Sequence, residues 1–113
     1  MTAYRGEIWL INLNPIKKSN EIEKIRPALI LQNDALNSGN YPTTIILPLT
    51  TSLIDDAQPL RYRVEKREKL EKDSDVLIAN IRAIDNARFI EKLASLTSKE
   101  LFTIKNLLDE VLM

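Results

Sequence analysis

The sequence predicts a mainly β protein: a small, strongly curved antiparallel barrel followed by a C-terminal helix. Short segments rich in β-branched residues recur from the N-terminus as far as Asp85, which is typical of strands. Few segments between them are long enough for the helical crossover that joins parallel strands, so we expect an antiparallel sheet. The last segment instead repeats its apolar residues at helical spacing. Because 113 residues are the length of one ordinary domain, we expect residues 1–113 to form a single domain.

The first two predicted strands are strongly apolar. Residues 6–13 are rich in apolar and β-branched side chains, and they end at the turn signal Asn14-Pro15. Residues 28–32 are apolar on both faces and too few for a helix. Since proline is tolerated at the start of a strand, Pro27 suits the beginning of this second, buried strand.

Three more strands follow after a loop. The loop is expected at residues 33–42, which hold three Asn, one Gly and one Pro. Residues 43–49 are again β-branched, but Pro48 indicates an edge strand or a bulged exit because proline donates no ladder hydrogen bond. Residues 60–64 alternate strictly between apolar and charged, as a half-exposed strand does. Residues 73–79 return to an apolar strand.

The C-terminal segment predicts a helix over residues 98–112. Thr97 and Glu100 match a capping box, in which each side chain accepts a hydrogen bond from the backbone of the other. Apolar residues then recur on one face, at Leu101, Ile104, Leu107, Leu108, Val111 and Leu112. This face could pack on the barrel of its own chain or contribute to a dimer interface, and the sequence leaves both open.

Composition excludes several classes of function. Hydrophobic residues make up 44% and charged residues 28% of the chain, as in ordinary globular proteins. Sixteen Lys and Arg balance sixteen Asp and Glu, which disfavours a non-specific nucleic-acid coat. With no Cys and no His, thiol nucleophiles, imidazole acid–base pairs and Cys/His metal sites are excluded. No apolar run approaches the ~20 residues that cross a bilayer, and no signal peptide is evident, so we expect a soluble cytoplasmic protein.

The strongest candidate for chemistry is Arg26. It lies where a charged loop meets a buried strand, and a guanidinium held there can bind a phosphate through several fixed hydrogen bonds. The alternative is a surface ion pair with Glu21 or Glu23.

Two threonines close the third strand. Thr50 and Thr51 carry short hydroxyl groups that can donate to a phosphate oxygen. Alternatively, they cap a turn before Asp55 and Asp56.

Other polar residues give weaker signals. Arg82 has apolar neighbours, so it needs either an anion or an ion pair, for which Asp85 is the nearest candidate. Arg61 and Arg63 begin a local excess of positive charge, but interleaved glutamates indicate a solvated charged surface. Trp9 lies on a strand that is apolar on both faces and is expected in the core.

In order and spacing, these segments resemble the MazF/PemK family of toxin endoribonucleases. The resemblance covers nearly the whole chain and includes Arg-Gly-Glu-Ile-Trp at 5–9, Arg-Pro at 26–27 and Ile-Arg-Ala-Ile-Asp at 81–85. It implies an SH3-like barrel of the PemK/CcdB type, a homodimer, and metal-independent cleavage of single-stranded RNA without a cofactor. It also implies an antitoxin protein that inhibits by covering the RNA groove.

The resemblance assigns roles to seven residues. It implies that Arg26 and Thr50 are the catalytic pair, with Glu21 as a third catalytic residue. The implied RNA-binding residues are Asn20, Lys24, Thr51 and Arg82. The expected reaction is attack of the RNA 2′-hydroxyl on the adjacent phosphorus, giving a 2′,3′-cyclic phosphate and a 5′-hydroxyl. Because arginine keeps its proton, the general base is either Glu21 or a relay through Arg26 and the phosphate.

Two other classes of function compete with this one. The first is a gyrase poison of the CcdB type, which shares the fold class but acts by binding a protein. The second is a barrel that serves only as an interaction module, with Arg26 in a surface ion pair. The Arg-Pro and Thr combination argues against the gyrase poison. An aromatic-lined peptide groove would support the interaction module, but the chain's six aromatic residues give little material for one.

Overall fold

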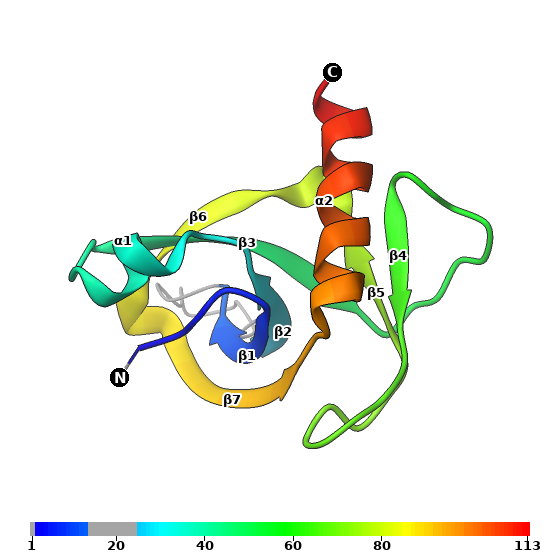
Figure 1. Ribbon diagram of the computed structural model, residues 1–113. Helices are drawn as coiled ribbons and strands as arrows, with labels where there is room; N and C mark the ends of the chain where they lie inside the picture. The colour runs from blue at the N-terminus through cyan, green and yellow to red at the C-terminus, as the bar shows by residue number, and fades with distance from the viewer. Residues whose placement is uncertain (1, 14–24) are drawn as a thin grey trace, which may run out of the picture.

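A computed structural model describes residues 2–13 and 25–113, in which antiparallel strands curl around a long C-terminal helix (Figure 1). The strands are β1 (Glu7–Asn12), β2 (Ile25–Ile30), β3 (Thr43–Thr50), β4 (Arg61–Val64), β5 (Ser74–Leu77), β6 (Arg82–Asp85) and β7 (Phe89–Ser95). The helices are α1 (Asp34–Ser38) and α2 (Ser98–Leu112), with the single 3₁₀ turns η1 (Ile78–Asn80) and η2 (Asn86–Arg88). The expectation of a mainly β, antiparallel fold with a C-terminal helix is confirmed.

The strands form one sheet in the order β4-β5-β3-β2-β1-β7, and β6 pairs with β3 beside β5. The sheet curls until its two ends meet: the Lys69 N–H, which follows β4, donates to the Leu93 carbonyl of β7 over 2.8 Å. Within the described residues no ladder joins β4 to β7. The fold is therefore barrel-like, with an opening that is bridged by single contacts rather than by a continuous ladder.

Two apolar clusters cover the two faces of the central strands. One lies under α2 and is centred on Ile8, Leu29, Leu47, Ile104 and Leu107. The other lies on the opposite face, contributed by Trp9, Ile11, Ala28, Ile30, Ile46 and Ile84. Because α2 supplies two members of the first cluster, its apolar face packs on the barrel of its own chain.

Gly6 fixes the start of β1. Its φ of +88° lies in the left-handed region that side chains other than glycine rarely adopt. Its N–H donates to the Ile30 carbonyl and its carbonyl accepts from the Leu96 N–H, each over 2.9 Å. This residue thereby ties the start of β1 to both neighbouring strands.

Several expected elements differ from the observed ones. The loop expected at 33–42 contains the short helix α1, which begins because the Asn33 side chain accepts a hydrogen bond from the Ala35 N–H. Strand β7 was not expected at all; three consecutive residues in it, Ile90, Glu91 and Lys92, are exposed, so it shows little alternation. Leu60 precedes β4 and is 55% exposed rather than packed with its strand.

Pro48 does not mark an edge. It lies within β3, the central strand, opposite Ala28 of β2. The Leu31 N–H donates to the Ile45 carbonyl, so odd-numbered residues of β3 bond to β2 and the Pro48 nitrogen faces the other side. On that side the pairing with β6 ends at Ile46 and the pairing with β5 begins at Leu49. Proline is tolerated because it sits where β3 changes partners.

In the part of the chain that the structure describes, none of the helices combines the length and the apolar character needed to cross a membrane.

The capping box of α2 is present in full. The Glu100 N–H donates to Thr97 Oγ1 over 3.1 Å, and the Thr97 N–H donates to Glu100 Oε1 over 2.9 Å. Thr97→Ala removes the cap and is expected to lower the free energy of unfolding by about 1 kcal/mol. Urea denaturation measures this change. Thr103→Ala, in the middle of the same helix, is the control, because Thr103 Oγ1 donates to the Lys99 carbonyl within the helix and caps no helix end. An equal loss in both variants would contradict the assignment.

Candidate active site

The register of β2 and β3 puts Arg26 and Thr50 on one face of the sheet. Ala28 pairs with Pro48 and Ile30 with Ile46, and the ladder ends at Ala28 and Pro48. Arg26 and Thr50 each lie two residues beyond this last pair, so their side chains are on the same face as those of Ala28 and Pro48. The two predicted catalytic residues therefore belong to neighbouring strand ends on one face of the sheet.

This face is open to solvent where the two residues lie. Arg26 shares its face with Ala28 and the Trp9 cluster, at the end of that cluster. Its side chain is exposed, and Thr50 is half-exposed. Among residues 2–13 and 25–113 no carboxylate lies within ion-pair distance of Arg26. The alternative pairing with Glu21 or Glu23 falls outside the described residues.

The Thr50 hydroxyl is held by one hydrogen bond. Its Oγ1 accepts from the Ser52 N–H over 3.1 Å, which closes a turn just after β3. The expected turn-capping role is thus observed. Since the oxygen is the acceptor, the hydroxyl hydrogen is left to donate to another group.

A row of polar residues continues across the sheet from Thr50. Thr50 pairs with Asp75 of β5, and Asp75 pairs with Arg63 of β4. Since residues paired across strands share a face, Thr50, Asp75 and Arg63 form one polar row across three strands, on the face that also carries Arg26. The opposite face of these strands carries Val76 and the core under α2.

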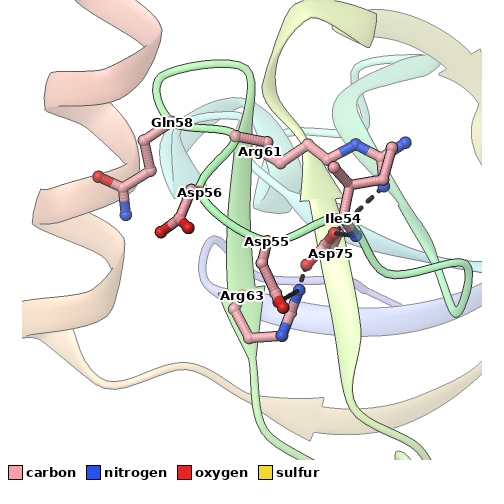
Figure 2. A pocket seen from close by; sticks show the side chains of 8 residues that line it. Ile54, Asp55, Asp56, Gln58, Arg61, Arg63 and Asp75 are labelled. Atoms are coloured by element: carbon pink, nitrogen blue, oxygen red, sulfur yellow. Dashed lines mark hydrogen bonds and ion pairs between the residues drawn. The ribbon is translucent and has the colours of Figure 1, made fainter.

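Asp75 is the buried centre of an ionic cluster (Figure 2). It is 1% exposed, and its Oδ1 accepts from Arg63 Nε over 2.6 Å. Its Oδ2 accepts from Arg61 Nη1 over 3.1 Å and from the Ile54 N–H over 2.9 Å. Arg63 Nη2 also bonds to Asp55 over 2.9 Å. Arg61 and Arg63 remain partly exposed, but they also pair with a buried carboxylate, a partner that the sequence did not indicate.

The pKa of Asp75 reflects this cluster. Burial alone would raise the pKa, but hydrogen bonds from Arg63, the Ile54 N–H and Arg61 outweigh burial and hold it below its ordinary value of 3.8. The carboxylate is therefore charged at neutral pH. The sequence signal for this buried carboxylate is that Asp75 directly precedes the apolar run 76–79.

The remaining candidate residues are more dispersed. Arg82 pairs with Ile46 and so lies on the same face, four residues along β3 from Thr50, on the order of 13 Å. Asp85 caps η2 through the Ala87 N–H instead of pairing with Arg82. Thr51 is exposed and lines a hollow with Leu10 and Pro27. Three further candidates, Asn20, Glu21 and Lys24, lie outside the described residues.

Trp9 belongs to the core, as expected. It is 5% exposed, its Nε1 donates to Glu7 Oε1 over 2.9 Å, and its ring contacts Phe89 at a centroid distance of 5.9 Å. It is not a stacking platform for a base.

The chain is thus a small, barrel-like antiparallel β protein. One solvent-exposed face of its sheet carries arginine and threonine side chains. Residues 4–112 match the family described as the PemK-like, MazF-like toxin of type II toxin-antitoxin systems. The chain belongs to this family.

Named relatives agree with the family match. The chain is 35% identical over 106 residues to the endoribonuclease MazF of Staphylococcus epidermidis, covering 93% of this chain and 87% of the relative. It is 37% identical over 107 residues to endoribonuclease MazF of Staphylococcus saprophyticus, with the same coverage.

Solved structures share the fold. A MazE-MazF structure from Deinococcus radiodurans superposes with a TM-score of 0.81 at 23% identity, covering 99% of this chain and 96% of that one. The Mycobacterium tuberculosis toxin MazF-mt6 gives 0.76 at 17% identity, covering 94% and 95%.

Acid should destabilise the protein through Asp75 and Glu100. The hydrogen bond from Arg67, aided by the Thr97 backbone, holds the pKa of Glu100 below its ordinary 4.5. A carboxylate with a lowered folded pKa contributes stability above its unfolded pKa and loses it as pH falls through the folded one. The urea midpoint should thus be steady from about pH 7 to about 5 and then fall. Glu100→Gln should reduce the fall; an identical pH profile in this variant would contradict the prediction.

Proposed function

We propose that this chain is the toxin of a type II toxin-antitoxin system, a single-domain endoribonuclease that cleaves single-stranded RNA without a metal or cofactor. The observation that supports the proposal is that Arg26 and Thr50 lie at neighbouring strand ends, on one solvent-open face of a fold whose relatives are named endoribonucleases. The family match favours this function over a gyrase poison of the CcdB type.

The reaction follows from what these groups can do. Attack of the 2′-hydroxyl on the adjacent phosphorus builds extra negative charge on the non-bridging oxygens. A guanidinium, with fixed N–H donors and a permanent charge, stabilises that charge more in the transition state than in the ground state. The free hydrogen of the Thr50 hydroxyl supplies a further, neutral donor. The products are a 2′,3′-cyclic phosphate and a 5′-hydroxyl.

The proton transfers need a separate group. Arg26 keeps its proton, so it serves as an electrostatic catalyst and not as a simple base. We propose Glu21 as the base, with a relay through Arg26 and the phosphate as the alternative. Asn20, Lys24, Thr51 and Arg82 are proposed to hold the RNA on either side of the cleaved bond.

We also propose the setting in which the protein acts. One Deinococcus relative was determined as a MazE-MazF complex, and a mycobacterial endoribonuclease with its cognate antitoxin. By analogy, this chain is proposed to bind an antitoxin protein that blocks the RNA face, to form a homodimer and to act in the cytoplasm.

Arg26→Ala is expected to lower the rate of RNA cleavage by about 100- to 1,000-fold, the cost of removing one oxyanion donor. Because the side chain is exposed, the thermal unfolding midpoint should not change. Arg5→Ala is the matched control: Arg5 is also exposed but lies near the opposite end of β2, next to Gly6, which bonds to Ile30. Full activity in Arg26→Ala would remove this residue from the mechanism.

Cleavage should persist in excess chelator, because no step requires a divalent ion. A defined single-stranded RNA is digested with EDTA present, and the fragment ends are analysed for a 2′,3′-cyclic phosphate and a 5′-hydroxyl. Activity that disappears with the metal, or a 5′-phosphate product, would contradict the scheme.

A further inference from the structure

Burying the charged Asp75 side chain costs the fold free energy. A charge removed from water is costly unless it is well paired, and a buried ion pair is often no more stabilising than an apolar replacement. Yet Asp75, at 1% exposure, receives three donors from the two arginines of β4 and from the segment after β3. Stability alone is a weak account of this arrangement.

A continuous chain of hydrogen bonds joins Asp75 to Thr50. Arg61 Nη1 donates both to Asp75 Oδ2 over 3.1 Å and to the Ser52 carbonyl over 2.8 Å. The N–H of the same Ser52 donates to Thr50 Oγ1 over 3.1 Å. The orientation of Ser52 therefore depends on Asp75, and the orientation of the Thr50 hydroxyl depends on Ser52.

The same cluster fixes the rest of the segment that follows Thr50. Asp75 holds the Ile54 N–H, and Arg63 holds the Asp55 carboxylate. Figure 2 shows the hydrogen bonds of Arg61, Arg63 and the Ile54 N–H meeting at Asp75, whereas Asp56 and Gln58 point away from it. Residues 52, 54 and 55 are thus held by the buried Asp75 carboxylate, either directly or through an arginine, although the segment itself is exposed.

We propose that Asp75 is a positioning residue for RNA cleavage, which through Arg61 and Ser52 sets the direction of the Thr50 hydroxyl. This inference rests on the proposed function. Without the carboxylate, Arg61 and Arg63 turn to solvent, the segment 52–55 gains freedom and the hydroxyl no longer holds one direction. Since catalysis depends on alignment more than binding does, the loss appears in kcat and little in KM.

Asp75→Asn tests the proposal, because it keeps the shape and removes the charge. The expected result is a kcat lower by about 10- to 100-fold, the scale of a small misplacement, with KM for a short RNA changed less than about threefold. Glu100→Gln is the matched control: it removes a carboxylate held by Arg67 at 2.6 Å, outside the Thr50 row. This control should lose stability and keep its kcat.

Arg61→Met provides a second variant and a coupling measurement. It removes both hydrogen bonds of the guanidinium while keeping a long, apolar stem. If one chain of contacts acts on Thr50, the double variant should lose no more kcat than Asp75→Asn alone. Losses that multiply would mean two independent effects and would overturn the proposal.

Hydrogen exchange of the backbone amides provides a test that does not depend on RNA cleavage. In Asp75→Asn, the Ser52 and Ile54 amides should exchange at least about tenfold faster, with the core strands unchanged. Unchanged exchange there, or an unchanged kcat in an active protein, would overturn the positioning role. A wild-type protein that cleaves no RNA would instead overturn the proposed function, and with it the catalytic meaning of this cluster.

Discussion

The register between β2 and β3 is the constraint on which the site depends. Leu29 and Leu47 are fully buried on one face, and Ala28 and Ile46 on the other. A slip of one residue would exchange the faces of every side chain in a strand, and here each face carries its own cluster of buried apolar residues. Core packing thus excludes other registers, and the surviving one carries Arg26 and Thr50 to the same open end of the sheet.

The sequence predicts which residues form this site better than it predicts how they are arranged. Arg26 and Thr50 could be singled out from a strand start, a strand end and a family resemblance. That they lie at neighbouring strand ends could not be predicted, because it depends on the path of the connection 31–42. This connection includes the helix α1, which no periodicity in the sequence indicates. The helix α2 was predictable to its first residue because its capping box is local. Strand β7 was not, because its pairing with β1 contains two register shifts.

Electrostatic partners were the hardest feature to predict. Arg61 and Arg63 lie close to glutamates along the chain, which suggested a solvated surface. Their partner is Asp75, fourteen residues from Arg61 and twelve from Arg63, and the β4–β5 register brings it to them. An aspartate within an apolar strand is a local signal for such a partner, since an unpaired buried carboxylate would be too costly. Such an aspartate indicates that cations lie close to it, but only the strand pairing shows which cations they are.

The same pairing explains how a chain with no net charge can present a face suited to a polyanion. Arg61 and Arg63 lie on β4, on the same face as Thr50, but Asp75 and Asp55 neutralise them. Arg26 and Arg82 share the face and, in the described ranges 2–13 and 25–113, neither forms an ion pair. Paired arginines shape the segment after Thr50. Within the described residues, local positive charge on this face therefore arises from cations that stay unpaired rather than from an excess of cations, and the proposed function assigns the RNA phosphates to these unpaired arginines.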